Sequence, residues 1–138
     1  MVTSRWDVPA LRAGGSVALV FAVPFSIAAS WAADRGSSTL AVWLVLGAVA
    51  GFWLGAGCAA WVQRVGMPLT HGLVTATGTY LVAQSLFVLV KILSGGTVRW
   101  FGLLFNLSVV SLVGVLGGLV GRRMRNRGAL PSSERGPE

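Results

Sequence analysis

Residues 36–63 read GSSTLAVWLVLGAVAGFWLGAGCAAWVQ, a run without a single charged side chain. Three further intervals, 13–33, 65–90 and 100–121, also lack Asp, Glu, Lys and Arg. A helix needs about 20 consecutive, mainly apolar residues to cross the hydrocarbon core of a bilayer, and each interval is long enough. We therefore expect an all-α membrane protein with four transmembrane helices, at about 14–33, 40–62, 70–93 and 100–121.

The composition of the chain favours the same class. Only 11% of the 138 residues are charged and 54% are apolar, whereas soluble domains carry roughly 25% charged residues. We expect one up-down bundle to occupy residues 1–127. The remaining residues, 128–138, are rich in Pro, Gly and Ser and have little to bury, so we expect a disordered cytoplasmic tail.

The basic residues predict the orientation of the bundle. If both termini are cytoplasmic, the outer side holds three basic residues, Arg35, Lys91 and Arg99, against eight on the inner side. This asymmetry follows the positive-inside rule and predicts an N-in/C-in, multi-pass protein of the cell (plasma or inner) membrane. The eight inner residues are Arg5, Arg12, Arg64, Arg122, Arg123, Arg125, Arg127 and Arg135.

A group of arginines directly follows the fourth span. It consists of Arg122, Arg123, Arg125 and Arg127. Basic residues next to a membrane attract anionic lipid headgroups by ~1 kcal/mol each. We therefore expect the lipid bilayer and its anionic headgroups as partners. We do not expect nucleic acid, because the positive charge is gathered at the end of a membrane span.

The first span has an alternative interpretation as a cleaved signal peptide. A basic start precedes its apolar stretch, and Ser30, Trp31 and Ala32 resemble a small-x-small cleavage site. Three further spans follow it, however, where a secreted protein would have a soluble domain. We expect the first helix to be retained.

The second span carries a small residue at every fourth position, in the manner of a glycine zipper. These residues are Gly47, Gly51, Gly55 and Ala59. In a bilayer, apolar side chains are as well solvated by lipid as by another helix, so the hydrophobic effect does not drive helices together. Small residues on one helix face instead favour association, because they allow another helix to approach closely. Similar small faces follow in the third span, at Gly72, Ala76, Thr79 and Ala83, and in the fourth, at Gly114 and Gly118. We expect the second and third spans to pack through these faces, because a short loop joins them.

Polar side chains are few within the predicted spans. Gln84 and Asn106 fall at similar depths in the third and fourth spans, so we expect them to form an interhelical hydrogen bond. Such a bond is worth about 0.6 kcal/mol in a membrane. In the alternative interpretation they line a path for an ion or small molecule. His71, the only histidine, begins the third span, and we expect it at the membrane interface.

The residues of this chain do not assemble into a known catalytic set. All four acids, Asp7, Asp34, Glu134 and Glu138, lie outside the predicted spans, and Cys58 is the only cysteine. Paired carboxylates, a Ser-His-Asp set or a Cys/His ligand cluster cannot be built from them. We expect no enzymatic activity, no cofactor and no metal.

Residues 47–84 read GAVAGFWLGAGCAAWVQRVGMPLTHGLVTATGTYLVAQ. They combine a glycine-striped second helix, a short basic loop and a His-Gly start to the third helix. This pattern resembles that of small uncharacterised four-helix bacterial integral membrane proteins. The resemblance implies a bacterial membrane protein of four helices and implies no activity.

Two functions therefore stay open. The first is a non-enzymatic scaffold or accessory subunit that packs with copies of itself, as a homo-oligomer, or within a larger membrane complex. The alternative is a small oligomeric channel or carrier with a polar path near Gln84 and Asn106.

Overall fold

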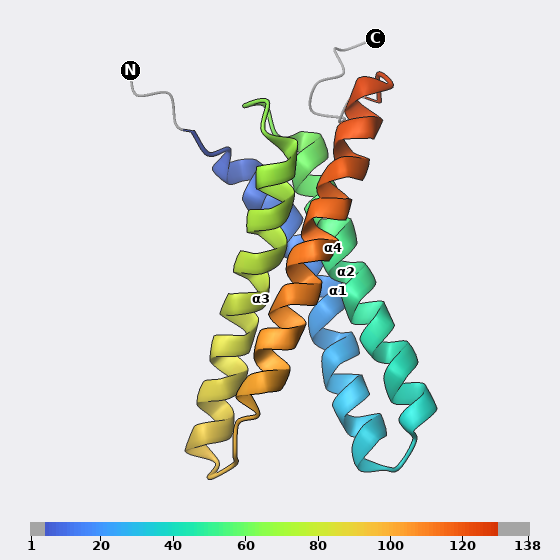
Figure 1. Ribbon diagram of the computed structural model, residues 1–138, viewed down its shortest axis with the longest axis vertical. Coiled ribbons are helices and arrows are strands. Elements are labelled where there is room, and N and C mark those ends of the chain that lie inside the picture. The colour runs from blue at the N-terminus through green and yellow to red at the C-terminus, as the bar shows by residue number, and fades with distance from the viewer. Residues whose placement is uncertain (1–4, 130–138) are drawn as a thin grey trace.

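The computed structural model describes residues 5–129 as four helices joined by short turns (Figure 1). The helices are α1 (Val8–Asp34), α2 (Ser38–Val62), α3 (Pro68–Leu93) and α4 (Trp100–Asn126). All four are long and apolar enough to cross a membrane. The expected all-α class and the expected four helices are thus confirmed. The predicted tail at 128–138 lies outside the described residues, apart from its first two positions.

Two helices extend well beyond the charge-free runs. α1 begins at Val8 because Asp7 caps it, with the carboxylate accepting a hydrogen bond from the Ala10 N–H at 3.1 Å. α4 continues through the arginines to Asn126. A charged side chain ends the membrane-compatible part of a helix but does not end the helix, so hydropathy alone makes both helices too short.

Three of the four helices end with the same backbone cap. The caps are centred on Gly36, Gly95 and Gly128, whose φ angles are 76°, 72° and 77°. In the first, the N–H of Ser37 donates to the carbonyl of Ala32 at 2.9 Å, which satisfies a carbonyl that the helix leaves unpaired. α2 ends differently, with a side chain from another helix at its last carbonyls.

The helices form two hairpins, α1–α2 and α3–α4, that cross each other (Figure 1). The ends of the described chain lie together with the α2–α3 turn, and we call this side the terminal end. The α1–α2 and α3–α4 turns lie at the opposite side, the hairpin end, toward which the two hairpins separate. α2 is the central helix: α2 and α3 each contact all three of the others, but the contacts of α2 are the more extensive.

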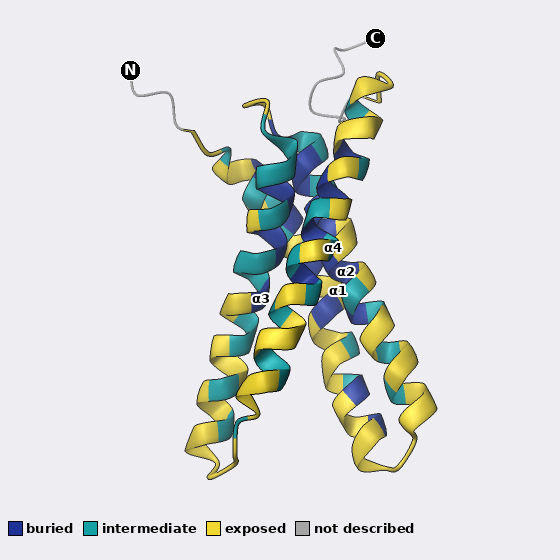
Figure 2. Ribbon diagram, viewed as in Figure 1, coloured by how far each residue is buried: buried dark blue, intermediate teal, exposed yellow. Residues whose placement is uncertain are grey.

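Burial is concentrated toward the terminal end (Figure 2). The buried apolar residues of the described chain are alanines, except for Phe52, Tyr80 and Val110. In α3 the buried positions end at Tyr80, and in α4 they begin at Val110. In the hairpin half of α3 and α4 every residue is therefore exposed or half-buried, and Phe101 reaches 84% exposure. In a bilayer such surfaces face lipid or the helices of another protein.

Candidate functional site

The glycine stripe of α2 lies against α1. A Cβ atom added at Gly51 would stand 2.7 Å from the Cβ of Phe21 and 3.1 Å from the backbone nitrogen of Ala22. One added at Gly55 would stand 2.7 Å from the Cβ of Ala18. The two separations of 2.7 Å are shorter than those of real Cβ atoms, so the two backbones approach as closely as they do only because no side chain lies between them.

The expectation that the small faces of the second and third spans meet each other is wrong. Gly47 faces the ring of Phe25 in α1, where an added Cβ would come within 2.7 Å, and Ala59 lies beside Gly14 of the same helix. Sequence neighbours joined by a short loop share an end, but α2 turns its glycine stripe to α1 along most of its length. Thr79 of α3 contributes to a separate contact, with its hydroxyl 3.3 Å from a Cβ added at Gly15.

The small residues of α4 lie against two helices at once. Gly114 and Gly118 meet the backbone of α3 at Gly72, where an added Cβ would lie 2.7 Å from the carbonyl oxygen of Gly114. A Cβ added at Gly114 would in turn lie 2.8 Å from the Cβ of Ala76. Gly117 packs against α2, with the Cβ of Ala56 2.8 Å from its own added Cβ. The fourth helix thus joins α3 to α2, while Ala83, further along α3, is only half-buried.

The expected bond between Gln84 and Asn106 is absent from the described residues. Asn106 is exposed on α4, close to the hydroxyl group of Tyr80. That hydroxyl donates its proton to the carbonyl of Leu103 at 3.0 Å. Gln84 is half-buried on α3. Similar depth along two helices does not bring two side chains together, because the rotation of α4 about its axis turns Asn106 to the exposed face.

His71 is fully buried at the terminal end, where an interfacial position was expected. It is 0% exposed, and its two ring nitrogens have different partners. Nε2 accepts the backbone N–H of Asp7 at 3.1 Å, and Nδ1 lies 2.9 Å from the carbonyl of Met67. Since a neutral imidazole has one donor and one acceptor, these partners assign the proton to Nδ1. The ring of Trp6 lies 5.8 Å away, between centroids.

Asp7 connects the start of α1 to the α2–α3 turn. One carboxylate oxygen caps α1, and the other accepts the backbone N–H of Arg64 at 2.9 Å. Within the turn, the side-chain oxygen of Gln63 accepts the N–H of Met67 at 3.3 Å. Position 7, two residues before Pro9, carried a helix-start signal in the sequence. Nothing in the sequence indicated that Asp7 contacts Arg64 and His71, which lie more than 50 positions away.

The four arginines that follow the charge-free run of α4 form a basic flank: Arg122, Arg123, Arg125 and Arg127. Arg125 belongs to the interior of the terminal end as well as to this flank. Its Nη1 donates to the carbonyls of Trp61, at 3.2 Å, and Gln63. The guanidinium therefore caps the end of α2, where its charge also complements the negative end of the helix dipole. Arg125 is half-buried, whereas Arg122, Arg123 and Arg127 are exposed as expected for residues at a membrane surface.

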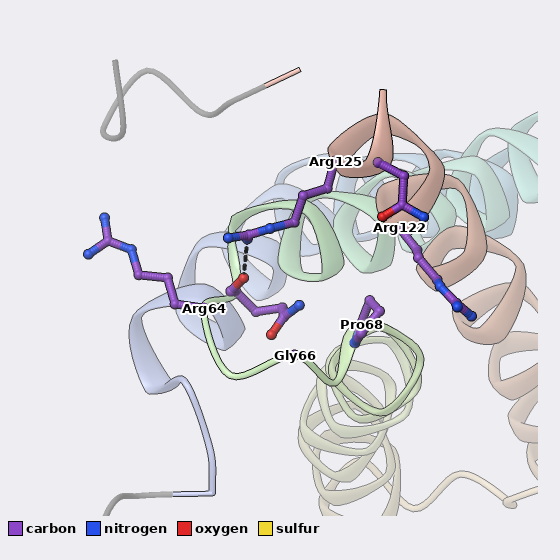
Figure 3. Close-up of a pocket in the computed structure, with 7 residues that line it drawn as sticks. Arg64, Gly66, Pro68, Arg122 and Arg125 are labelled. Atoms are coloured by element: carbon purple, nitrogen blue, oxygen red, sulfur yellow. Dashed lines mark hydrogen bonds between the residues drawn. The ribbon is translucent and has the colours of Figure 1, made fainter. Parts of the chain in front are cut away.

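Two adjoining cavities open beside these residues, with volumes of about 260 and 320 Å³. Gly66, Pro68 and Arg122 line both of them. Arg64 and Arg125 line the first as well (Figure 3). In Figure 3 the side chain of Arg122 extends beside Pro68, Arg125 reaches toward the turn, and the side chain of Arg64 points away from both. The site therefore combines a cationic lining with hydrogen-bond donors.

No protein-family model, curated protein or solved structure matches this chain. Within residues 5–129, no group of three or more His, Cys, Asp and Glu side chains is placed to hold a metal ion. Two features of the molecule bear on its function: the uneven packing of its hairpins, and the cationic cavities at the terminal end.

Proposed function

We propose that this integral membrane protein is a non-enzymatic scaffold or accessory subunit of the cell (plasma or inner) membrane, with both termini cytoplasmic. One observation carries the proposal: the hairpins are joined by small-residue contacts toward the terminal end, and they separate toward the hairpin end. The packed part holds the unit together. The separated part offers long helix surfaces to other transmembrane segments.

The exposed part of the α3–α4 hairpin supports this role. Beyond Tyr80 no described residue of α3 is buried, and Leu86 on α3 and Phe105 on α4 are 65% and 60% exposed. Association of helices in lipid depends on packing and polar contacts, since apolar side chains are equally well solvated by acyl chains. The hairpin end is where a second copy, or a helix of a larger complex, would add such packing.

Photo-crosslinking in native membranes tests the scaffold role. A photoreactive residue at Leu86 or Phe105 should crosslink to a protein, either a second copy or another membrane protein identified by mass spectrometry. Val20, which is 68% exposed on α1, provides a matched lipid-facing control. Adducts to lipid alone from all three positions would contradict the proposal.

The basic flank supports a further part of this proposal, attraction to anionic headgroups rather than to nucleic acid. Arg122 directly follows the charge-free run 100–121 and is therefore placed where lipid phosphates lie. Arg123 and Arg127 are exposed next to it. We also propose that the chain belongs with the small bacterial four-helix membrane proteins that it resembles. The pattern of residues 47–84 supports this proposal.

The alternative, an oligomeric channel or carrier, is favoured by Asn106. This side chain is exposed within the apolar run of α4, although its amide can donate and accept several hydrogen bonds. A polar amide facing hydrocarbon is costly unless another polar group covers it. A copy of the same hairpin could provide that group. Solute flux into vesicles containing the purified protein, abolished by Asn106→Leu, would favour this function over a scaffold.

A further inference from the structure

The two cavities at the terminal end have a lining suited to one class of ligand. Arg122 lines both, and Arg64 and Arg125 line the first. Within residues 5–129, no acidic side chain lines either cavity. Of the described acids, Asp7 is occupied with backbone N–H groups and Asp34 lies at the other end of α1. Among the described lining residues, Arg122 therefore brings positive charge to both cavities without a carboxylate beside it.

The first turn of α3 adds uncharged hydrogen-bond donors, its backbone N–H groups, to this lining. No side chain caps α3, whose first residue, Pro68, lacks an N–H group. Leu69 and Thr70 follow it and line the second cavity together with Arg122. The N–H groups of a first helical turn have no acceptor within the helix, and they carry the positive end of the helix dipole. The guanidinium of Arg122 and the start of α3 thus border the same space.

The volume of the cavities and their expected level in the membrane fit a phosphate group. A cavity of about 260 Å³ exceeds many times the space that one water molecule needs. Arg122 is the first charged residue after the run 100–121, so in a membrane it lies at the level of the headgroups. Guanidinium groups bind phosphate through paired, charge-assisted hydrogen bonds, which an ammonium group cannot reproduce.

We propose that the cavities around Arg122 form a discrete binding site for a phosphate-bearing anion, with Arg122 as its main ligand. The phosphate of an anionic phospholipid and a soluble phosphate share the chemistry that this site recognises. The inference rests on the attraction of the basic flank to anionic headgroups proposed above. It adds where the anion binds and how many anions bind to each protein. One anion binds between α3 and α4, while the other exposed arginines contribute only unspecific attraction.

Arg123 provides a control of equal charge. It is the next residue on α4 and is exposed, but it lines neither cavity. Removing either arginine lowers the net charge by the same amount. Unspecific attraction to a charged surface therefore changes equally in Arg122→Ala and Arg123→Ala, and only a discrete site distinguishes them.

Titration of the full chain in detergent with short-chain phosphatidylglycerol tests the site. We expect one lipid per protein, with phosphatidylcholine binding more weakly because its headgroup has no net charge. Arg122→Ala should weaken binding by about tenfold or more, as for the loss of a paired charged hydrogen bond. Arg123→Ala should weaken it by about twofold at most. Arg122→Lys, which keeps the charge, should fall between the parent and Arg122→Ala.

The outcomes separate the site from the unspecific attraction. Equal losses in the two alanine variants would overturn the site and leave the attraction to headgroups intact, whereas no loss in either would overturn both. Inorganic phosphate that displaces the lipid at similar concentration would assign the site to a soluble phosphate group. Displacement only at much higher concentration would assign it to a lipid headgroup. The unfolding temperature of Arg122→Ala should equal that of the parent, because this side chain is exposed.

Discussion

His71 connects three segments that lie far apart in the sequence. Its ring nitrogens bind the backbone of Asp7 and of Met67, and its ring lies close to Trp6. A buried polar group of this kind contributes little net free energy while it is satisfied, but it is costly once a partner is lost. The residue therefore specifies how the start of α1 sits on the α2–α3 turn.

Replacement of the imidazole tests this role. His71→Phe keeps an aromatic ring and leaves the N–H of Asp7 without its acceptor, so we expect the free energy of unfolding to fall by about 1–3 kcal/mol. Denaturant unfolding in detergent measures the change. Nitrogen NMR of the parent protein gives an independent check, because Nδ1 should carry the proton and Nε2 should not. A proton on Nε2 would contradict the assigned hydrogen bonds.

At the scale of helices, α2 owes its central position to small residues on two of its faces. Gly51 and Gly55 approach α1, and Ala56 approaches Gly117 of α4. Packing through backbones leaves no flexible side chain that could move aside. A single added methyl group must therefore displace a whole helix.

Two glycine substitutions separate packing from helix propensity. Gly51→Ala introduces a Cβ 2.7 Å from that of Phe21, whereas at Gly78 of α3 an added Cβ meets nothing within 4 Å. Alanine favours helix over glycine by about 1 kcal/mol, so Gly78→Ala should be neutral or stabilising. Gly51→Ala should lower the unfolding free energy, and Gly51→Leu should lower it further, by about 1–3 kcal/mol, through overpacking. Equal stability of Gly51→Ala and Gly78→Ala would mean that α1 and α2 do not pack as described.

At the scale of the whole molecule, both ends of the described chain lie at one side and two interhelical turns at the other (Figure 1). The same side contains the α2–α3 turn with Arg64 and the end of α4 with its arginines. The opposite side has a smaller set of basic residues, and Arg35 there lies 3.5 Å from the ring centre of Trp31. The distribution of charge along the fold therefore predicts its orientation in the membrane.

Reporter fusions test this orientation. An enzyme that is active only in the cytoplasm should be active when fused after Glu138 and inactive when inserted at Ser37, in the α1–α2 turn. A reporter that is active only outside the cytoplasm should give the opposite result at each position. The expectation follows from eight basic residues on one side against three on the other. Exchange of the two patterns would reverse the assignment.

The sequence by itself determined the membrane class, the number of spans and their approximate limits. Long uncharged runs have one main physical outcome, because only a helix satisfies its own backbone in hydrocarbon. The sequence also identified a face of small residues at every fourth position of α2, with Gly51 near its centre. The charges next to the runs predicted which side each end occupies.

Only the tertiary structure decided which faces meet. α2 is apolar on all sides, so periodicity could not show that its glycines face α1 instead of α3. The burial of His71 depended on Asp7, 64 positions away, and the cap on α2 depended on Arg125, more than 60 positions away. Such contacts have no local signature, because they arise from how the hairpins cross. In a membrane the hydrophobic effect does not select one crossing over another, and close packing of small residues does.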